Sequence, residues 1–225
     1  MKKYQYLLLF SFTVSFIALM NGCKKDNIAI PNSVYIEEFE NVYKEVYQKG
    51  WATKNGTNYW TWGQGQSGTD KSGNVYGFPA YSYNLTSDEY AYSGLFYPDT
   101  SISISNWLIT PQFSIHNGSK ISFYTRGDFS DSVVSVSYTN RMQVRMSITG
   151  ANDIGDSIND VGSFTTTLID INPTQAPGGY PSSWTKYEYT FSGIDGTIYP
   201  RIAFRHYLIN PTNARGIGVD LFKLE

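Results

Sequence analysis

The sequence predicts an all-β fold in which two antiparallel sheets pack face to face. Aromatic residues make up 16% of the chain, with 19 Tyr, and charged residues also make up only 16%. Aromatic residues favour strands, and the 20 Gly suit the many turns that such a fold needs. About a dozen short alternating segments follow one another at fairly even spacing, which is the pattern of a sandwich. At 225 residues the chain suits one large domain, and no repeat or second domain is evident.

The centre of the predicted fold is a pair of segments around Pro111. The segment 105–115 indicates a strand that bends or leaves its sheet at Pro111, because proline has no N–H to donate. A turn cluster separates it from 120–126, where apolar and polar residues alternate as in a half-buried strand. We expect the two segments to form a hairpin-like centre with strands on both sides.

The other strands are predicted from the same alternation. They span 34–40, 50–53, 58–62, 89–97, 141–148, 164–171, 184–191, 197–207 and 216–224. Residues 41–49 have a weak helical period and are expected to hold one helical turn. The polar stretches expected to be loops are 63–74, 127–140, 150–162 and 173–183. The side chains expected to face outward from 141–148 are Arg141, Gln143, Arg145 and Ser147.

One core is predicted to lie between the two sheets. Its expected members are apolar residues drawn from six of the strands or their ends, namely Trp107, Leu108, Phe123, Val144, Met146, Trp184, Phe204 and Val219. Large residues at alternate positions of neighbouring strands meet on one face, and this places them together.

The N-terminal residues predict export and lipid anchoring. A basic start, Met1-Lys2-Lys3, is followed by an apolar stretch and then by Cys23, where a cleavage site belongs. This resembles a bacterial lipoprotein signal, in which the cysteine is acylated, palmitate included, and becomes the mature N-terminus. We expect a signal peptide over 1–22, the lipidated Cys23 with a tether over 23–33, and the domain over 34–225.

Two alternatives to the lipoprotein signal are a plain secretory peptide and a single membrane anchor, although the apolar stretch is short for a span. Lys24 follows the cysteine where an inner-membrane retention signal would have Asp. The expected location is therefore the outer membrane, with the domain facing the periplasm or exposed on the surface.

Charge and cysteine content exclude several classes of function. Cys23 is the single cysteine, so no disulfide and no thiolate metal site can form within the chain. Removal of residues 1–22 changes the net charge from −2 to −4, because it removes Lys2 and Lys3 and no acidic residue. A weakly acidic chain without a basic block is not expected to bind nucleic acid.

A series of motifs runs in order through the domain. They are Glu38-Phe39-Glu40, Gly50-Trp51, Trp60, 106–111, 121–124, 142–147, 183–187, 201–205 and 216–220. This order resembles the choice-of-anchor J and cleaved-adhesin group of jelly-roll domains, related to MAM domains, from about Tyr35 to Glu225. The resemblance implies a jelly-roll sandwich that serves as a surface or secreted binding and adhesion module, usually non-catalytic and often holding a structural Ca²⁺.

Calcium requires six to eight oxygen ligands, mostly from carboxylates and carbonyl groups. Glu40 near the first strand and Asp220 in the last are the candidate ligands, because terminal strands commonly pair in such sandwiches. A second acidic group, in the loop 150–162, has no EF-hand pattern. Many members of the resembled group carry an Asp-rich run after Gly-Trp, whereas this chain has Lys54 and Asn55 there.

Signals for catalysis are sparse. Nucleophilic hydrolysis needs a base beside a Ser or Cys, and only His116 and His206 exist. His116 is expected in a turn, and His206 in a strand as a hydrogen-bonded structural residue. A glycosidase needs only two well-placed carboxylates, which a sequence cannot exclude.

A ligand site is expected beside the polar loop that follows Trp62. Trp62 and Tyr76 flank this loop and would form a partly exposed aromatic platform, suited to the C–H faces of sugars. Gln64, Gln66 and Asp70 would supply polar contacts. On this view, Trp62→Ala should leave thermal stability nearly unchanged and weaken binding.

These observations together favour a lipid-anchored, non-catalytic surface module that binds carbohydrate or protein, for adhesion or glycan capture. A glycan-degrading enzyme and a structural component of an outer-membrane complex are the two alternatives. Apart from the structural Ca²⁺ that the resemblance implies, no cofactor is expected.

Overall fold

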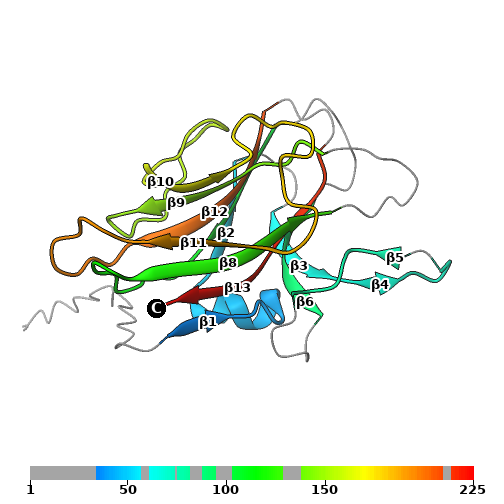
Figure 1. The fold of residues 1–225 in the computed structure, drawn as a ribbon, viewed down its shortest axis with the longest axis horizontal. Helices are drawn as coiled ribbons and strands as arrows, with labels where there is room; N and C mark the ends of the chain where they lie inside the picture. The colour runs from blue at the N-terminus through cyan, green and yellow to red at the C-terminus, as the bar shows by residue number, and fades with distance from the viewer. Residues whose placement is uncertain are drawn as a thin grey trace, which may run out of the picture.

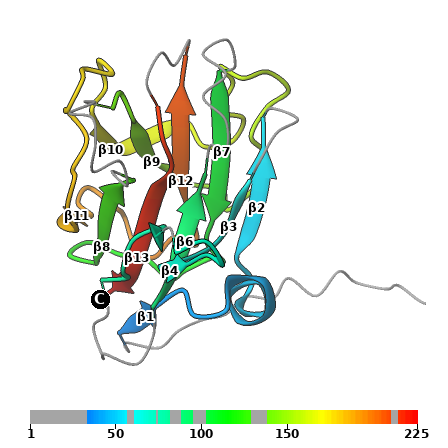
Figure 2. The same cartoon turned by 90° about the vertical axis from the view of Figure 1, so that its right-hand side faces the viewer.

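The computed structural model describes residues 34–56, 61–73, 75–81, 88–94, 103–128, 138–209 and 214–225. Within them, nearly every element is a strand, and the strands form two antiparallel sheets that face each other (Figure 1). Figure 2 shows the same sandwich turned by 90°, with β1 and a short helical segment at its lower edge. The predicted fold class, an all-β two-sheet sandwich, is confirmed.

The described strands divide between the two sheets and one small hairpin. In spatial order the six-stranded sheet contains β11 (Thr185–Thr190), β8 (Lys120–Gly127), β13 (Ile217–Leu224), β6 (Glu89–Ser93) and β3 (Trp62–Gln66), with β1 (Tyr35–Glu37) also paired to β13. The five-stranded sheet contains β10 (Thr166–Ile171), β9 (Met142–Ser147), β12 (Arg201–Leu208), β7 (Ile104–Ile109) and β2 (Ala52–Asn55). A hairpin of β4 (Gly68–Thr69) and β5 (Val75–Tyr76) projects away from the sandwich (Figure 1).

The two central segments lie in different sheets and do not form the predicted hairpin-like centre. β7 ends just before Thr110, whose N–H still donates to the carbonyl of Ile202 at 2.9 Å. Pro111 then takes the chain out of the ladder, because it has no N–H to continue it. The N–H of Phe113 donates to the carbonyl of Pro200 at 3.2 Å, and a bridge joins Ile115 to Ile198, before β8 begins in the opposite sheet. The proline therefore ends a strand where the chain crosses between layers.

The main core lies between the sheets. The predicted core residues found in it are Leu108, Phe123, Val144, Met146, Phe204 and Val219. The predictions for Trp107 and Trp184 are wrong. Neighbours in a strand face opposite sides, so the inward Leu108 sends Trp107 outward, where it packs against Phe164. Trp184 packs on the outer face of the six-stranded sheet, edge-on to Phe78.

A short helical segment follows β1, as the weak period of 41–49 predicted. It consists of η1 (Val42–Val46) and η2 (Tyr47–Lys49). Val42 and Val46 are fully buried in the main core, and this contact holds the segment against the sheets.

The outer face of the five-stranded sheet is buried beneath a covering loop (residues 150–164). Arg145 and Gln143 face this outer side as predicted, but the loop shields both from solvent. Arg145 donates to the carbonyls of Phe164 at 2.7 Å and Thr165 at 3.2 Å. Arg145 therefore contacts the main chain at the end of the loop and at the residue that follows it.

Arg205 provides the second such contact. Its guanidinium donates to the carbonyls of Ile158 at 2.5 Å and Asp160 at 3.0 Å. Its Cζ lies over two aromatic rings, 4.6 Å from the ring centre of Trp107 and 3.9 Å from that of Tyr207. Burial lowers the pKa of Arg205 to about 10. The group remains charged at neutral pH, and main-chain carbonyls and aromatic faces surround it.

A crossing segment (residues 77–81) covers part of the outer face of the six-stranded sheet. Its ring Phe78 stacks on Tyr90, with ring centres 4.5 Å apart, and starts a small apolar cluster there. Hydrogen bonds also hold the segment: Phe78 N to Tyr90 Oη, Ala80 N to Asp88 Oδ1, Tyr81 N to Asp220 Oδ2, and Trp184 Nε1 to the carbonyl of Pro79. Asp220 therefore serves to hold this segment on the sheet.

Candidate binding site

The expected aromatic platform does not form, because Trp62 is a core residue. It is the first residue of β3, its exposed fraction is 0%, and its Nε1 donates to the carbonyl of Asn106 at 3.0 Å. The stretch expected to be a flexible loop after it is instead largely strand. Gly63 and Gly65 allow this, because a Cβ at Gly63 would collide with the hydroxyl of Tyr43, and one at Gly65 with the Tyr90 ring. These glycines permit close aromatic packing on a strand.

Gln64 is also structural. Its Oε1 accepts from the N–H of Val42 at 2.5 Å, and its Nε2 donates to the carbonyls of Phe39 at 3.5 Å and Gly65 at 3.2 Å. The amide therefore ties the start of η1 to β3, and its hydrogen-bonding groups are engaged within the protein.

Tyr76 and Asp70 lie together on the projecting hairpin, apart from the buried Trp62. Tyr76 has an exposed fraction of 46%, and Asp70 is exposed near the hairpin tip. Asp70 Oδ1 accepts from the N–H of Ser72 at 2.8 Å, and its carbonyl accepts from the N–H of Gly73 at 3.0 Å. Asp70 thus shapes the turn of the hairpin.

The candidate calcium ligands Glu40 and Asp220 have different surroundings. Asp220 is buried, and its two carboxylate oxygens accept from the N–H groups of Tyr81 at 2.9 Å and Leu221 at 2.7 Å. Glu40 lines a surface hollow to which Asp220 does not contribute. In the described ranges, no three His, Cys, Asp or Glu residues are grouped so as to hold one metal ion. Calcium binding stays a prediction.

The acidic residues of the covering loop stabilise its turns. Asp153 Oδ1 accepts from the N–H of Gly155 at 3.0 Å. Asp160 Oδ2 accepts from the N–H groups of Ser157 at 2.9 Å and Asp156 at 3.2 Å. These hydrogen bonds, chiefly those from Ser157, lower the pKa of Asp160 because they stabilise its charged form.

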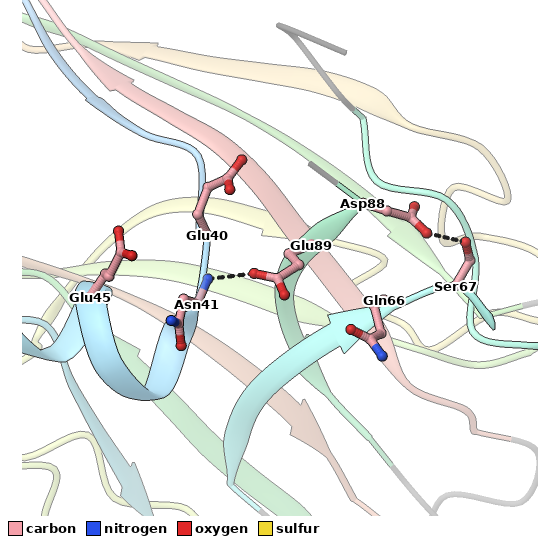
Figure 3. A pocket seen from close by; sticks show the side chains of 7 residues that line it. All are labelled: Glu40, Asn41, Glu45, Gln66, Ser67, Asp88 and Glu89. Carbon is pink, nitrogen blue, oxygen red and sulfur yellow. Dashed lines mark hydrogen bonds between the residues drawn. The ribbon is translucent and has the colours of Figure 1, made fainter. Parts of the chain in front are cut away.

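The hollow lined by Glu40 is the candidate binding site. It has a volume of about 480 Å³ and is open to solvent. Its lining residues are Glu40, Asn41, Glu45, Gln66, Ser67, Asp88 and Glu89. They come from the link between β1 and η1, from η1 itself, from the end of β3 and from the start of β6. In Figure 3, Glu89 lies between Glu40 and Asn41 on one side and Gln66 and Ser67 on the other.

Hydrogen bonds fix one side of the hollow. The N–H of Asn41 donates to Glu89 Oε2 at 2.6 Å, which joins the link before η1 to β6 (Figure 3). Asp88 accepts from the hydroxyl of Ser67 through Oδ2 and from the N–H of Ala80 through Oδ1. The antiparallel pairing of β3 with β6 places Gln66 opposite Glu89 and sets the width of this side.

The other lining side chains are available to a ligand. Among the described residues, the side chains of Glu40, Glu45 and Gln66 make no hydrogen bond or ion pair. With Asn41 and the held carboxylates, they give the hollow four carboxylates, two amides and one hydroxyl. Such a surface accepts hydrogen bonds from a ligand rich in hydroxyl or amino groups, and carboxylate acceptors make the strongest of these bonds.

Neither histidine is placed for general-base chemistry in this hollow. His206 is fully buried, its Nδ1 lies 3.0 Å from Ser93 Oγ, and burial lowers its pKa to about 3. This confirms the prediction of a structural histidine. His116 lies exposed in a turn, with its Nδ1 2.6 Å from Ser119 Oγ. In the described chain no carboxylate is hydrogen-bonded to either ring, so the third member of a nucleophilic triad is missing.

Comparisons with known proteins bear on the fold. No family model and no curated protein sequence matches the chain. Among solved structures, the K1 cleaved-adhesin domain of Lys-gingipain from Porphyromonas gingivalis W83 is 20% identical, with a TM-score of 0.53 over 86% of this chain and 98% of that one. The K2 domain of Lys-gingipain is 16% identical, with a TM-score of 0.54 over 87% and 99%.

The chain has the fold of a cleaved-adhesin domain. Identities of this size show the fold alone, so the function has to be argued from the site. The fold that the motif order implied is confirmed, and it spans nearly the whole length of both adhesin domains.

The sequence located this site only in part. Glu40 was predicted as a calcium ligand, and Gln66 as a polar contact beside the aromatic platform. Glu45, Asp88 and Glu89 were missed, because strand pairing and the entry to η1 bring them to the others from distant positions. The two acids at 88–89, where a predicted strand begins, were the one local signal.

Proposed function

We propose that this protein is a non-catalytic binding module that captures glycan at the cell surface through the hollow between β3, β6 and η1. The observation that carries the proposal is the lining of the hollow, in which every side chain is a hydrogen-bonding group. Sugar hydroxyls are donors as well as acceptors, and carboxylates and amides are the groups that bind them. Protein partners usually anchor through buried aromatic residues, and the hollow has none among its lining residues.

Two further observations support a binding role over a catalytic one. Asp88 and Glu89 are both engaged as hydrogen-bond acceptors within the protein, so neither is free to act as a general acid or base. The K1 and K2 domains of Lys-gingipain, which share the fold, are adhesin domains. A glycan-degrading enzyme remains the alternative that the experiment below must exclude.

The hollow is tested by a double variant, Glu45→Gln with Gln66→Ala, measured by calorimetry against the best ligand from a glycan array. We expect binding to weaken by at least about 1 kcal/mol, or about fivefold, a loss typical of a residue important for binding. The melting temperature should not change, because neither side chain bonds to another described residue.

Asp195→Asn is the matched control, since Asp195 is exposed in the loop between β11 and β12 and does not line the hollow. Unchanged affinity in the double variant would remove the hollow as the binding site. Release of reducing sugar from any glycan by the wild-type protein would establish the enzyme instead. Co-purification with an outer-membrane complex, without glycan affinity, would favour the structural role.

We also propose that acyl chains on Cys23 hold the module at the outer membrane. Cys23, the signal 1–22 and the tether 23–33 lie outside the described residues. None of the helices in the described ranges is both long and apolar enough for a membrane span. The proposal rests on the order of basic start, apolar stretch and cysteine in the sequence.

Cys23→Ala is expected to move the protein from the membrane fraction to the soluble fraction, because stable attachment needs more than one acyl chain on that residue. Membrane and soluble fractions are compared by immunoblot, with Ser33→Ala as a control that leaves the lipid in place. A Cys23→Ala protein that stays in the membrane with its signal uncleaved would indicate a simple membrane anchor.

A further inference from the structure

Three polar residues meet in the apolar space between the two sheets. Ser93 is the last residue of β6 in the six-stranded sheet, while Asn106 on β7 and His206 on β12 belong to the five-stranded sheet. Their exposed fractions are 0%, 2% and 0%. Asn106 Nδ2 lies 3.2 Å from Ser93 Oγ, which lies 3.0 Å from His206 Nδ1. The three side chains therefore form a hydrogen-bonded bridge from one sheet to the other.

The direction of each hydrogen bond follows from the chemistry of the donors. An amide nitrogen such as Asn106 Nδ2 can only donate, so Ser93 Oγ is the acceptor in the first bond. The single hydroxyl hydrogen of Ser93 is then free to donate to His206 Nδ1. A ring nitrogen that accepts carries no proton, so the proton of the neutral imidazole is on Nε2. The low pKa of the buried ring agrees with a neutral imidazole at pH 7.

This assignment leaves one donor and one acceptor without partners. His206 Nε2 and Asn106 Oδ1 are both buried, and neither has a hydrogen-bond partner in the part of the chain that the structure describes. The two residues are directly opposite each other in the pairing of β12 with β7, so their side chains are neighbours on the inner face. On the other side of His206, the paired residue is Met142, which offers no carbonyl, amide or hydroxyl group from its side chain.

Buried polar atoms in native proteins are nearly always satisfied, by protein or by an ordered water. We propose that a buried water molecule binds between these residues, accepting from His206 Nε2–H and donating to Asn106 Oδ1. One donor and one acceptor on adjacent strands suit a single water molecule, which can serve both at once. The water would close the polar bridge on the side away from Ser93.

The proposal is tested first on the unmodified protein, by nitrogen-15 NMR of its two histidines. At pH 7 we expect His206 as a single tautomer with Nδ1 unprotonated and Nε2 protonated, and a rotating-frame Overhauser contact between its Hε2 and a long-lived water. His116, exposed beside Ser119, is the internal reference for a solvated ring. The Nδ1–H tautomer, or an Nε2–H that contacts the Asn106 side chain and no water, would overturn the proposal.

Ser93→Ala provides a second test, because it removes the hydroxyl that holds the tautomer. We expect the loss of the single-tautomer pattern at His206 and faster exchange of Hε2 with solvent. Ser119→Ala is the matched control, since it makes the same change beside the other histidine and should leave His206 unaltered. A Ser93→Ala protein that keeps the wild-type His206 spectrum would contradict the bridge. If this variant does not fold, the measurement on the unmodified protein still decides the matter.

Discussion

Replacement of Trp62 by alanine is expected to destabilise the protein by about 3–5 kcal/mol, the range for removing a large aromatic side chain from a core. Trp62 is fully buried in the main core, so the change removes apolar contacts and leaves a cavity. It also removes the donor to the carbonyl of Asn106, which then has one partner fewer inside the protein. This is the opposite of the small effect that the sequence suggested.

The measurement is urea unfolding, followed by tryptophan fluorescence and circular dichroism, which gives the free energy of unfolding of the wild type and of Trp62→Ala. Tyr76→Ala is the control, because Tyr76 is exposed on the projecting hairpin and its loss should cost no more than about 0.5 kcal/mol. Equal stabilities of the two variants would show that Trp62 is not a core residue in solution.

Stability is expected to fall as the pH is lowered from about 6.5 toward 3. Burial holds the pKa of His206 at about 3 in the folded protein, whereas an unfolded histidine has a pKa of about 6.5. Below pH 6.5 the unfolded chain therefore binds a proton that the native chain does not. The free energy of unfolding should drop by roughly 1.4 kcal/mol per pH unit over this window, and be unaffected by His206 above it.

The measurement is a set of urea titrations between pH 7.5 and 5. This range lies above the pH at which carboxylates such as Glu225 titrate. Hydrogen bonds from Lys120 and Lys223 lower the pKa of Glu225 to about 2. His206→Gln should remove most of the slope from a lower starting stability, while His116→Gln should retain it. A wild-type stability that is constant from pH 7.5 to 5 would mean that His206 is solvated.

The strand pattern of the fold follows from local alternation, and for this reason most of it could be predicted. Segments such as 197–207 have period-2 apolar positions, and Ile202 and Phe204 face the core as that period requires. The partner of each strand is set by distant contacts, so the separation of β7 and β8 into two sheets was not visible. The error at Trp107 was avoidable, because adjacent residues in a strand cannot share a face.

The failures at the site have two physical origins. The glycine content of 63–74 favours a flexible loop, whereas in the structure Gly63 and Gly65 leave room for Tyr43 and Tyr90 on one face of β3. The alternation of Gly and Gln from Gly63 to Gln66 already had the period of a strand. The hollow itself depends on β3–β6 pairing between residues more than twenty positions apart, and no local pattern encodes such a pairing.

The manner in which Arg145 and Arg205 hold the covering loop affects how freely that loop can evolve. Both guanidinium groups bind main-chain carbonyls, which every amino acid possesses. Side chains at exposed positions such as Ala151 and Asp156 can therefore be exchanged while those contacts remain in place. If the module is displayed at the cell surface as proposed, such a loop can change its antigenic appearance without loss of the fold. It is also the natural position for an inserted epitope or a randomised recognition sequence.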